Sequence, residues 1–414
     1  MLPNDRGYVM GCCGGGRARV EINDANAALL AEEYIRDELQ RSAAPPLLAH
    51  EPRGIVICAG GPRYLTNAYV LLKRLRALGC TLPVELWHLG PEELNPAWFE
   101  LAKDLGPIEA VDAREVQKHQ PHDRLNGWEL KPYAVQWCNF QEVLLIDADN
   151  VPVRNPEFVF DSPEYREAGT VFWPDYTEHA KGRRVWKVFG VQYRQEPQVE
   201  SGQVLVDKRK AGVWQALQLA NWYCGRSAYF FDVILGDKET FHFAWRKLEQ
   251  SYAMPPHRIR TFHPGTMGQN WFDGELLFLH RNMSKWRYAD DNPRVAGFKD
   301  EDACLDALAE LRASWSPAAQ TLASEADRAD IERLSGLWNY ERVTRDARPL
   351  QLRPDGTCGL GSARCERYWT VRDGVVAIAA EDGRKTLTAE PVGDELRGAW
   401  LHHEKMPVVL TRLS

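Results

Sequence analysis

Apolar runs alternate with amphipathic stretches in the first part of the chain. Apolar runs over 54–59 and 83–89 flank an amphipathic stretch over 66–78, which predicts a strand, a helix and a second strand. The unbroken Val/Leu/Ile run over 143–146 is typical of a strand buried on both faces, as in a sheet covered by helices. We expect Val151-Pro152 to end regular structure after it, because proline cannot donate to a ladder. The pattern therefore predicts an α/β domain.

The texture changes near residue 336, where short strand-like segments replace the longer alternation. Hairpin-turn signals separate these segments at roughly regular spacing: Asp355-Gly356, Asp373-Gly374 and Asp382-Gly383. This pattern predicts a small antiparallel β-barrel or sandwich, similar in texture to lipocalin-like barrels, with Trp338, Trp369 and Trp400 in its core. The predicted organisation is a mobile tail and helix over 1–50, the α/β domain over 51–290, a helical linker over 291–335 and the β domain over 336–414.

Composition narrows the classes of function. The 414-residue chain carries a net charge of −7, which argues against nucleic-acid binding. Its nine cysteines show no C-x-x-C spacing, as expected for reduced thiols. The first residues contain no apolar signal-peptide core, and no apolar run is long enough to span a bilayer. We therefore expect a cytoplasmic protein without a transmembrane segment.

The buried run over 143–146 leads into two carboxylates, Asp147 and Asp149. Open α/β sheets keep their ligands at the carboxyl ends of strands. Two carboxylates this close repel each other, and a hard divalent cation such as Mn²⁺ or Mg²⁺ is the natural compensation. The alternative is an Asp-rich turn that binds nothing. His280 ends a later apolar run and Lys285 follows it, so a metal with a nearby lysine could stabilise a diphosphate leaving group.

Six sequence blocks extend this picture: 127–133, 144–150, 172–175, 200–203, 236–241 and 280–282. In their order and content, the segment over 54–288 resembles the retaining GT-A glycosyltransferases. It is most similar to the fungal-type α-mannosyltransferase family that elongates mannans, and more distantly to the glycogenin and galactosyltransferase group. The resemblance implies a GT-A-type, Rossmann-like nucleotide-sugar domain.

The resemblance also implies roles in metal and nucleotide binding. Asp147 and Asp149 would form the Asp-x-Asp pair that holds Mn²⁺ (or Mg²⁺), with His280 as the third ligand. The other reading of His280 is a core histidine with satisfied hydrogen bonds. Lys285 would contact the donor phosphate. The nucleotide would be bordered by Ala59, Gly60 and Tyr64.

A second set of implied roles concerns the sugar. Lys131 would hold the donor, and Asp237 would lie beside the anomeric carbon. Glu200 and Gln203 would line the sugar. Structural readings remain open for two of these residues: Lys131 as a surface lysine at a helix start, and Asp237 as a helix N-cap.

The reaction implied is transfer of a hexose, mannose first, from a nucleotide-diphosphate sugar to an acceptor hydroxyl with retention of configuration. GDP-mannose is favoured over a UDP-hexose as donor, and the acceptor is a glycan or another hydroxyl compound. In the retaining group the acceptor attacks from the leaving-group face, so no carboxylate need act as nucleophile. The fungal relatives are membrane-anchored, whereas this chain shows no anchor and adds a β domain, which leaves the mannan acceptor open. That domain would bind glycan, contact a protein partner or only pack.

Two alternatives stay open. Asp147, Asp149 and Val151 fit the Asp-x-Asp-x-Val/Thr motif of haloacid-dehalogenase-type phosphatases, in which the first Asp is the nucleophile. That motif normally lies on the first strand, whereas a complete strand–helix–strand region precedes it here. The other alternative is a catalytically inactive protein that binds sugar nucleotides or glycans.

Overall fold

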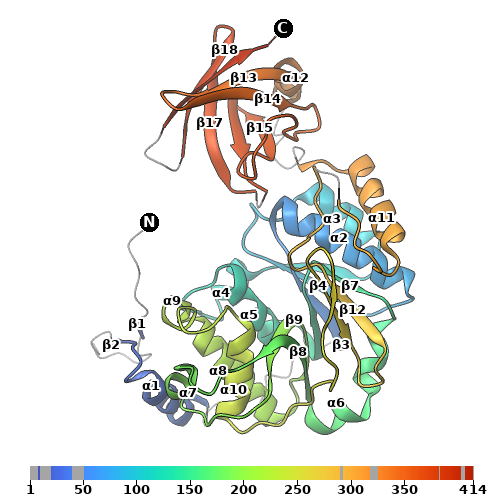
Figure 1. The fold of residues 1–414 in the computed structure, drawn as a ribbon, viewed down its shortest axis with the longest axis vertical. Coiled ribbons are helices and arrows are strands. Elements are labelled where there is room, and N and C mark those ends of the chain that lie inside the picture. Colours follow the sequence, from blue (N-terminus) through green and yellow to red (C-terminus); the bar gives the residue numbers. More distant parts are fainter. Residues whose placement is uncertain are drawn as a thin grey trace.

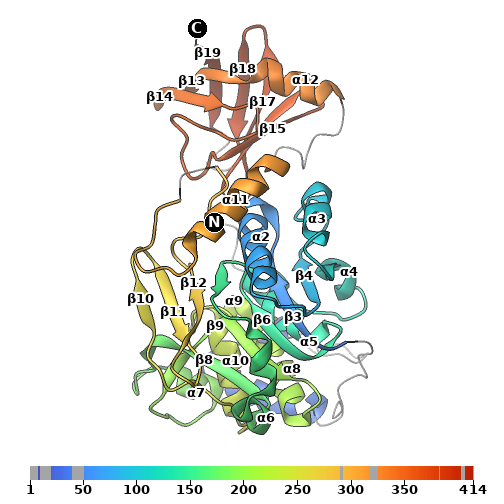
Figure 2. The ribbon, with the colours of Figure 1, turned by 90° about the vertical axis from the view of Figure 1, so that its right-hand side faces the viewer.

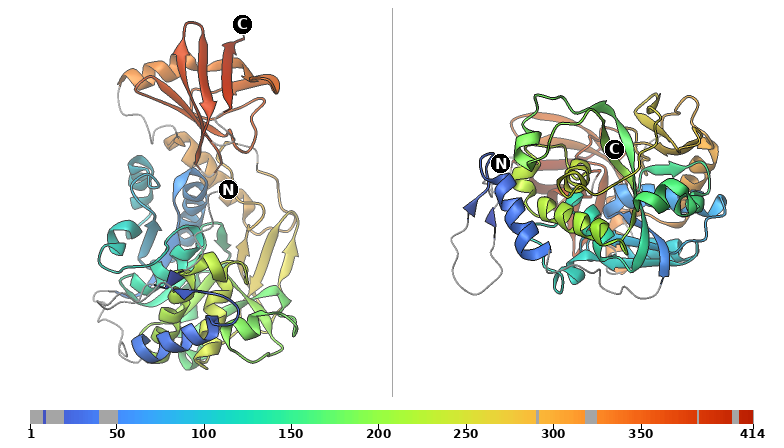
Figure 3. Two further views of the ribbon diagram at one scale, coloured as in Figure 1. Left: turned by 90° about the vertical axis from the view of Figure 1, so that its left-hand side faces the viewer. Right: turned by 90° about the horizontal axis from the view of Figure 1, so that it is seen from below.

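The computed structural model describes residues 8–9, 20–39, 51–289, 292–317, 325–381, 383–401 and 406–413. An α/β domain forms the lower part of the molecule and a β domain lies above it, with α11 (Glu301–Ser314) beneath the β domain and alongside the α/β helices (Figures 1 and 2). Figure 3 shows the same two tiers from two other sides. Most of the predicted N-terminal tail, over 1–7, 10–19 and 40–50, lies outside the described residues.

The α/β domain is built on a six-stranded sheet with the order β5-β4-β3-β6-β9-β8. The first four of these strands are parallel, and β9 and β8 add two antiparallel pairings at one side. The bounds, in sheet order, are Ile108–Asp112, Val84–His88, Glu51–Cys58, Phe140–Ile146, Pro197–Asp207 and Thr170–Glu178.

Helices cover both faces of this sheet, so the central strand β6 is buried on both sides. Leu144 and Ile146 face the core beneath α2 (Gly61–Ala77), α3 (Pro96–Lys103) and α11. Val143 and Leu145 face the opposite core, which lies against the helices α5 (Leu130–Trp137), α8 (Ala211–Cys224) and α10 (Lys238–Lys247). The continuous apolar run therefore forms the two-sided strand that its pattern predicted.

A smaller sheet beside the first has the order β10-β11-β12-β7. Its strands are Arg260–Phe262, Thr266–Asn270, Leu276–His280 and Asn150–Pro152. The expectation that regular structure ends at Val151-Pro152 is therefore wrong. Strand β7 lies at the edge of its sheet, where a proline without an N–H group is tolerated. Its antiparallel register sets Asn150 opposite His280.

The β domain is one curled antiparallel sheet with the order β14-β13-β19-β18-β17-β16-β15. Isolated bridges from Thr357 to β15 and from Cys358 to β14 draw its two edges toward each other. Trp338, Trp369 and Trp400 lie in its core, as predicted. The strands, in chain order, are Gly336–Arg342, Asp346–Leu352, Tyr368–Arg372, Val375–Ala379, Lys385–Val392, Glu395–Trp400 and Pro407–Arg412.

The predicted order of an α/β domain followed by a small antiparallel β domain is confirmed, and the β domain takes a half-barrel form rather than that of a sandwich. The helix α12 (Glu325–Leu334) packs on the β domain and places Ile331 and Leu334 in its core (Figure 1). The predicted domain boundaries stay predictions. Among the helices in the described residues, none combines the length and apolar character needed to cross a membrane.

Candidate active site

The candidate site lies where the order of the parallel strands changes direction. Strand β3 has β4 on one side and β6 on the other. The chain passes from β3 through α2 to β4, and only later returns to form β6. The crevice at such a switch point is the usual ligand site of an open α/β sheet. Ala59 follows β3, and Asp147 follows β6, so both border this crevice.

The turn after β3 is shorter than the sequence suggests, because α2 begins at Gly61 rather than near Thr66. Gly60 is the N-cap residue, and Pro62 starts the helix with a ring that needs no N–H partner. A side chain at Gly60 would collide with the Glu93 carboxylate. Packing alone therefore explains why a glycine occupies this position. Tyr64 lies half-buried in the first helical turn.

Asp147, Asp149 and His280 converge although they come from distant parts of the chain. Their ligating atoms all lie within 4.8 Å of one another. His280 Nε2 lies 3.4 Å from Asp149 Oδ2 and 3.9 Å from Asp147 Oδ2. Ligand atoms about 2.1 Å from an octahedral cation lie about 3.0 Å apart when adjacent and about 4.2 Å apart when opposite. Both measured separations fall in this range, so the three residues fit a small divalent cation.

The position of His280 depends on Gly202. A Cβ atom on Gly202 would lie 2.5 Å from His280 Nδ1, closer than carbon and nitrogen can pack. That nitrogen is buried without a hydrogen-bond partner among the described residues, and the Glu200 carboxylate is 3.8 Å away. Gly202 therefore leaves the space in which the imidazole lies.

Two lysines contact the paired carboxylates. Lys131 Nζ donates to Asp147 Oδ2 at 2.8 Å, and it lies 3.6 Å from Asp237 Oδ2. Lys285 Nζ donates to Asp149 Oδ2. All three aspartates thus face an ammonium group within the crevice, where low polarity strengthens the attraction.

Burial and neighbouring charge oppose each other in the pKa values of these groups. Burial would raise the pKa of Asp149, but His280 and Lys285 outweigh it and hold that pKa well below the usual range. Burial would lower the pKa of Lys131, but Asp147 and Asp237 outweigh it and raise that pKa. For Asp237 burial prevails, and its pKa is raised despite Lys131. Asp149 is therefore a carboxylate, and Lys131 an ammonium, at neutral pH.

Glu200 and Gln203 both come from β9. Burial raises the pKa of Glu200, with His280 opposing the shift. Gln203 is completely buried. Its amide group accepts a hydrogen bond from Asn150 Nδ2 at 2.7 Å and donates to Gln269 Oε1 at 2.6 Å. Gln203 therefore supports the turn after Asp149 by holding Asn150.

Four further residues of the site received no role from the sequence. The Ser201 hydroxyl donates to Asp237 Oδ2 at 2.6 Å and lies 3.4 Å from Lys131 Nζ, so it joins both groups. Trp128 is 55% exposed and packs against Gly236, next to Asp237. Lys238 forms an ion pair with Asp175, the last residue of the sequence block over 172–175. Their positions within the six blocks were the only signal available.

Solved glycosyltransferase structures show a limited likeness to this chain. The glycosyltransferase GlyE of Streptococcus pneumoniae TIGR4 has a TM-score of 0.34 and 14% identity, covering 50% of this chain and 45% of its own. The galactosyltransferase LgtC, solved with donor and acceptor sugar analogs, has a TM-score of 0.34 and 13% identity, covering 48% and 73%. Because both TM-scores are low, we draw no conclusion about function from these structures.

Curated relatives of the chain are yeast mannosyltransferases. The alpha-1,2-mannosyltransferase MNN22 of Candida albicans is 32% identical over 167 residues, which are 37% of this chain and 26% of the relative. MNN23 of the same yeast is 24% identical over 262 residues, which are 51% of this chain and 43% of the relative. The chain thus matches less than half of the length of either relative.

The family described as "Mannosyltransferase putative" matches residues 52–197 and 191–283, which together are more than half of the chain. All six sequence blocks lie within this region. The predicted resemblance is confirmed, and with it the assignment to the glycosyltransferase enzymes. The chain belongs to this mannosyltransferase family.

Proposed function

We propose that this chain transfers mannose from a nucleotide-diphosphate sugar to an acceptor hydroxyl, with retention of configuration. GDP-mannose is the favoured donor and a UDP-hexose the second choice. The observation that carries the proposal is the convergence of Asp147, Asp149 and His280 within a mannosyltransferase-family domain. The acceptor is a glycan or another hydroxyl compound.

In this proposal Asp147, Asp149 and His280 hold a Mn²⁺ or Mg²⁺ ion. A bound ion of this kind would supply positive charge to the diphosphate leaving group as the glycosidic bond breaks. Two carboxylates with one imidazole are a donor set that suits such cations. Lys285 lies against Asp149 and would bring a second positive charge to the same diphosphate.

The remaining residues orient the sugar and control charge around it. Lys131 is buried between Asp147 and Asp237, so its ammonium group can donate to a sugar or phosphate oxygen entering the crevice. The hydrogen bond from Ser201 keeps one Asp237 oxygen directed toward Lys131. Asp237 and Glu200 then present acceptors for sugar hydroxyl groups. None of these side chains is required as a nucleophile, in keeping with attack from the leaving-group face.

Substitution of Asp149 tests this assignment. We expect Asp149→Ala to lose Mn²⁺-dependent GDP-mannose binding by at least about 100-fold, because a metal ligand and the partner of Lys285 disappear together. Calorimetric titration of GDP-mannose with and without Mn²⁺ measures the loss.

Asp273→Ala is the matched control, because Asp273 pairs with Arg154 at the surface, outside the site. It should leave donor binding unchanged. Mn²⁺-dependent turnover that persists in Asp149→Ala at the wild-type rate would contradict the assignment.

A further inference from the structure

A cavity of about 300 Å³ lies between the α/β domain and the β domain. The α/β domain contributes residues from α2 and from the segment after β12, and the β domain contributes residues from the loop before β15 and from the turn between β16 and β17. The lining residues used below are Arg63, Lys285, Arg287, Arg364, Glu381 and Arg384. We call this cavity the interdomain pocket.

The interdomain pocket has a strong excess of positive charge. Five of its described lining residues are basic, and Glu381 is the only acidic one among them. Glu381 Oε1 lies 3.7 Å from Arg287 Nε, so it offsets part of one cation. Arg63 Nε is buried without a hydrogen-bond partner in the described part of the chain. A pocket lined mainly by basic side chains attracts anions.

The interdomain pocket and the proposed metal group share one residue, Lys285. Lys285 lines the pocket, and its ammonium group also pairs with Asp149. The turn of the β domain that carries Glu381 and Arg384 packs against the start of α2. A Cβ atom on Gly383 would lie only 2.8 Å from Pro62 Cδ. The β domain therefore reaches the turn that follows β3, where the nucleotide is expected.

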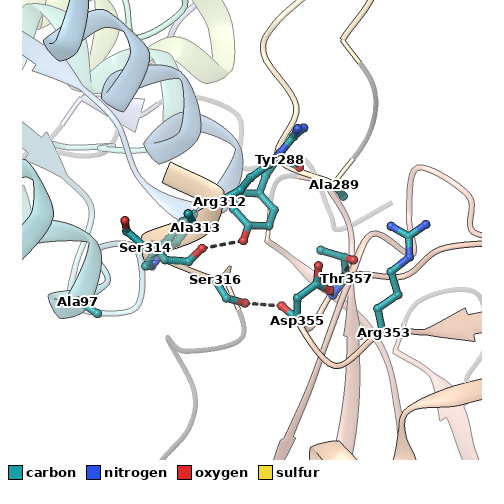
Figure 4. A pocket seen from close by; sticks show the side chains of 11 residues that line it. Ala97, Tyr288, Ala289, Arg312, Ala313, Ser314, Ser316, Arg353, Asp355 and Thr357 are labelled. Atoms are coloured by element: carbon teal, nitrogen blue, oxygen red, sulfur yellow. Dashed lines mark hydrogen bonds between the residues drawn. The ribbon is translucent and has the colours of Figure 1, made fainter. Parts of the chain in front are cut away.

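A second cavity between the domains, of about 520 Å³, differs in its lining (Figure 4). Its Arg312 donates to the backbone carbonyls of Tyr288 and Arg287, and Ser316 donates to the Asp355 carbonyl across the domain boundary. The Ser316 hydrogen bond thus reaches the β domain, whereas those of Arg312 join α11 to the segment after β12. Among their described lining residues, the interdomain pocket is therefore the more basic of the two cavities.

We propose that the interdomain pocket binds a phosphate group of the substrates, and that the β domain completes the active site by supplying Arg364 and Arg384. Planar guanidinium groups match phosphate oxygens with paired hydrogen bonds. The phosphate belongs either to the nucleoside diphosphate of the donor or to a phosphorylated acceptor. This inference rests on the proposed function, because Lys285 links the pocket to the donor site.

The test uses the double substitution Arg364→Ala/Arg384→Ala in the full chain. Arg397→Ala is the control, because Arg397 is an exposed arginine of the same sheet whose ion-pair partner among the described residues is Glu395, a near neighbour in the sequence. Calorimetric titrations use inorganic pyrophosphate without metal, GDP with Mn²⁺, and mannose 6-phosphate at saturating GDP. A variant with both arginines replaced by lysine preserves the charge and checks that any loss is electrostatic in origin.

We expect the double alanine variant to weaken pyrophosphate binding at least about 10-fold, the lysine variant less, and the control not at all. A parallel loss for GDP assigns the pocket to the donor, whereas a loss confined to mannose 6-phosphate assigns it to the acceptor. Unchanged binding of all three probes would overturn the inference. Wild-type protein that ignores GDP with Mn²⁺ would refute the proposed function instead, and the metal-free pyrophosphate titration would still test the pocket.

Discussion

At the scale of single residues, the contact between Gly202 and His280 decides whether the third proposed ligand can reach the two aspartates. The imidazole lies over the Gly202 backbone, and a methyl group there would occupy the space of its Nδ1 atom. The side chain of Asn150 also lies close, and it donates to the Gly202 carbonyl at 2.8 Å. The ring therefore has little room to move aside.

We predict that Gly202→Ala lowers Mn²⁺ affinity about 10- to 100-fold, the range seen when residues that orient metal ligands are lost. The reason is displacement of His280 from Asp149. Titration of Mn²⁺ followed by electron paramagnetic resonance measures the affinity. Gly182→Ala is the control, since a Cβ atom there meets no atom within 4 Å. Equal affinities in the two variants would show that His280 is not a ligand.

The same residues show what a sequence reveals about a site. Asp147 and Asp149 could be identified because they follow a buried strand directly. The contribution of Ser201 could not be identified, because its hydrogen bond to Asp237 depends on how β9 meets the start of α10. The role of Gln203 in lining the sugar stays a prediction, and the sequence could not reveal that its amide contacts Asn150 and Gln269. Side-chain direction at a strand end depends on the neighbouring sheet, which no local pattern reveals.

At the scale of elements, the short strand β7 connects the two halves of the proposed metal group. Asp149 lies at the turn between β6 and β7, and His280 ends β12, which pairs with β7. The Arg281 N–H donates to the Asp149 carbonyl at 2.9 Å and closes this ladder. The sequence suggested an end to regular structure here because proline is disfavoured within sheets. Because β7 lies at the edge of its sheet, it can contain a proline. The sequence could not show this, since the tertiary fold determines which strand lies at an edge.

Because of this arrangement, one buried leucine near the ladder should affect both stability and metal binding, whereas another in the opposite core should affect stability alone. Leu279 pairs with Val151 across the β7–β12 ladder, whereas Leu145 faces the opposite core of the same domain. Both are completely buried, so alanine at either position should lower the free energy of unfolding by about 2–5 kcal/mol. We predict that only Leu279→Ala also lowers Mn²⁺ affinity, measured well below the unfolding temperature. Equal metal affinities in the two variants would contradict a role for the ladder in positioning His280.

At the scale of the whole molecule, local sequence patterns predicted the strands and core of the β domain but not its position. Its hairpin signals predicted antiparallel strands, and the buried tryptophans predicted its core. Its position over the proposed donor site could not be predicted, because Arg364 and Arg384 are far in sequence from Arg63 and Lys285. The family match ends at residue 283, before this domain begins. The contribution proposed for this domain therefore lies outside the region that the family match covers.

The most direct test of the central claim is a thermal-unfolding and calorimetric titration of the wild-type chain with GDP-mannose, GDP and UDP-glucose, each with and without Mn²⁺. The account predicts that GDP-mannose and GDP bind more tightly when Mn²⁺ is present, and that either ligand at 100 times its dissociation constant stabilises the protein by about 2.7 kcal/mol. Absence of binding by every nucleotide, together with release of phosphate from simple phosphomonoesters, would contradict the account and favour the phosphatase alternative.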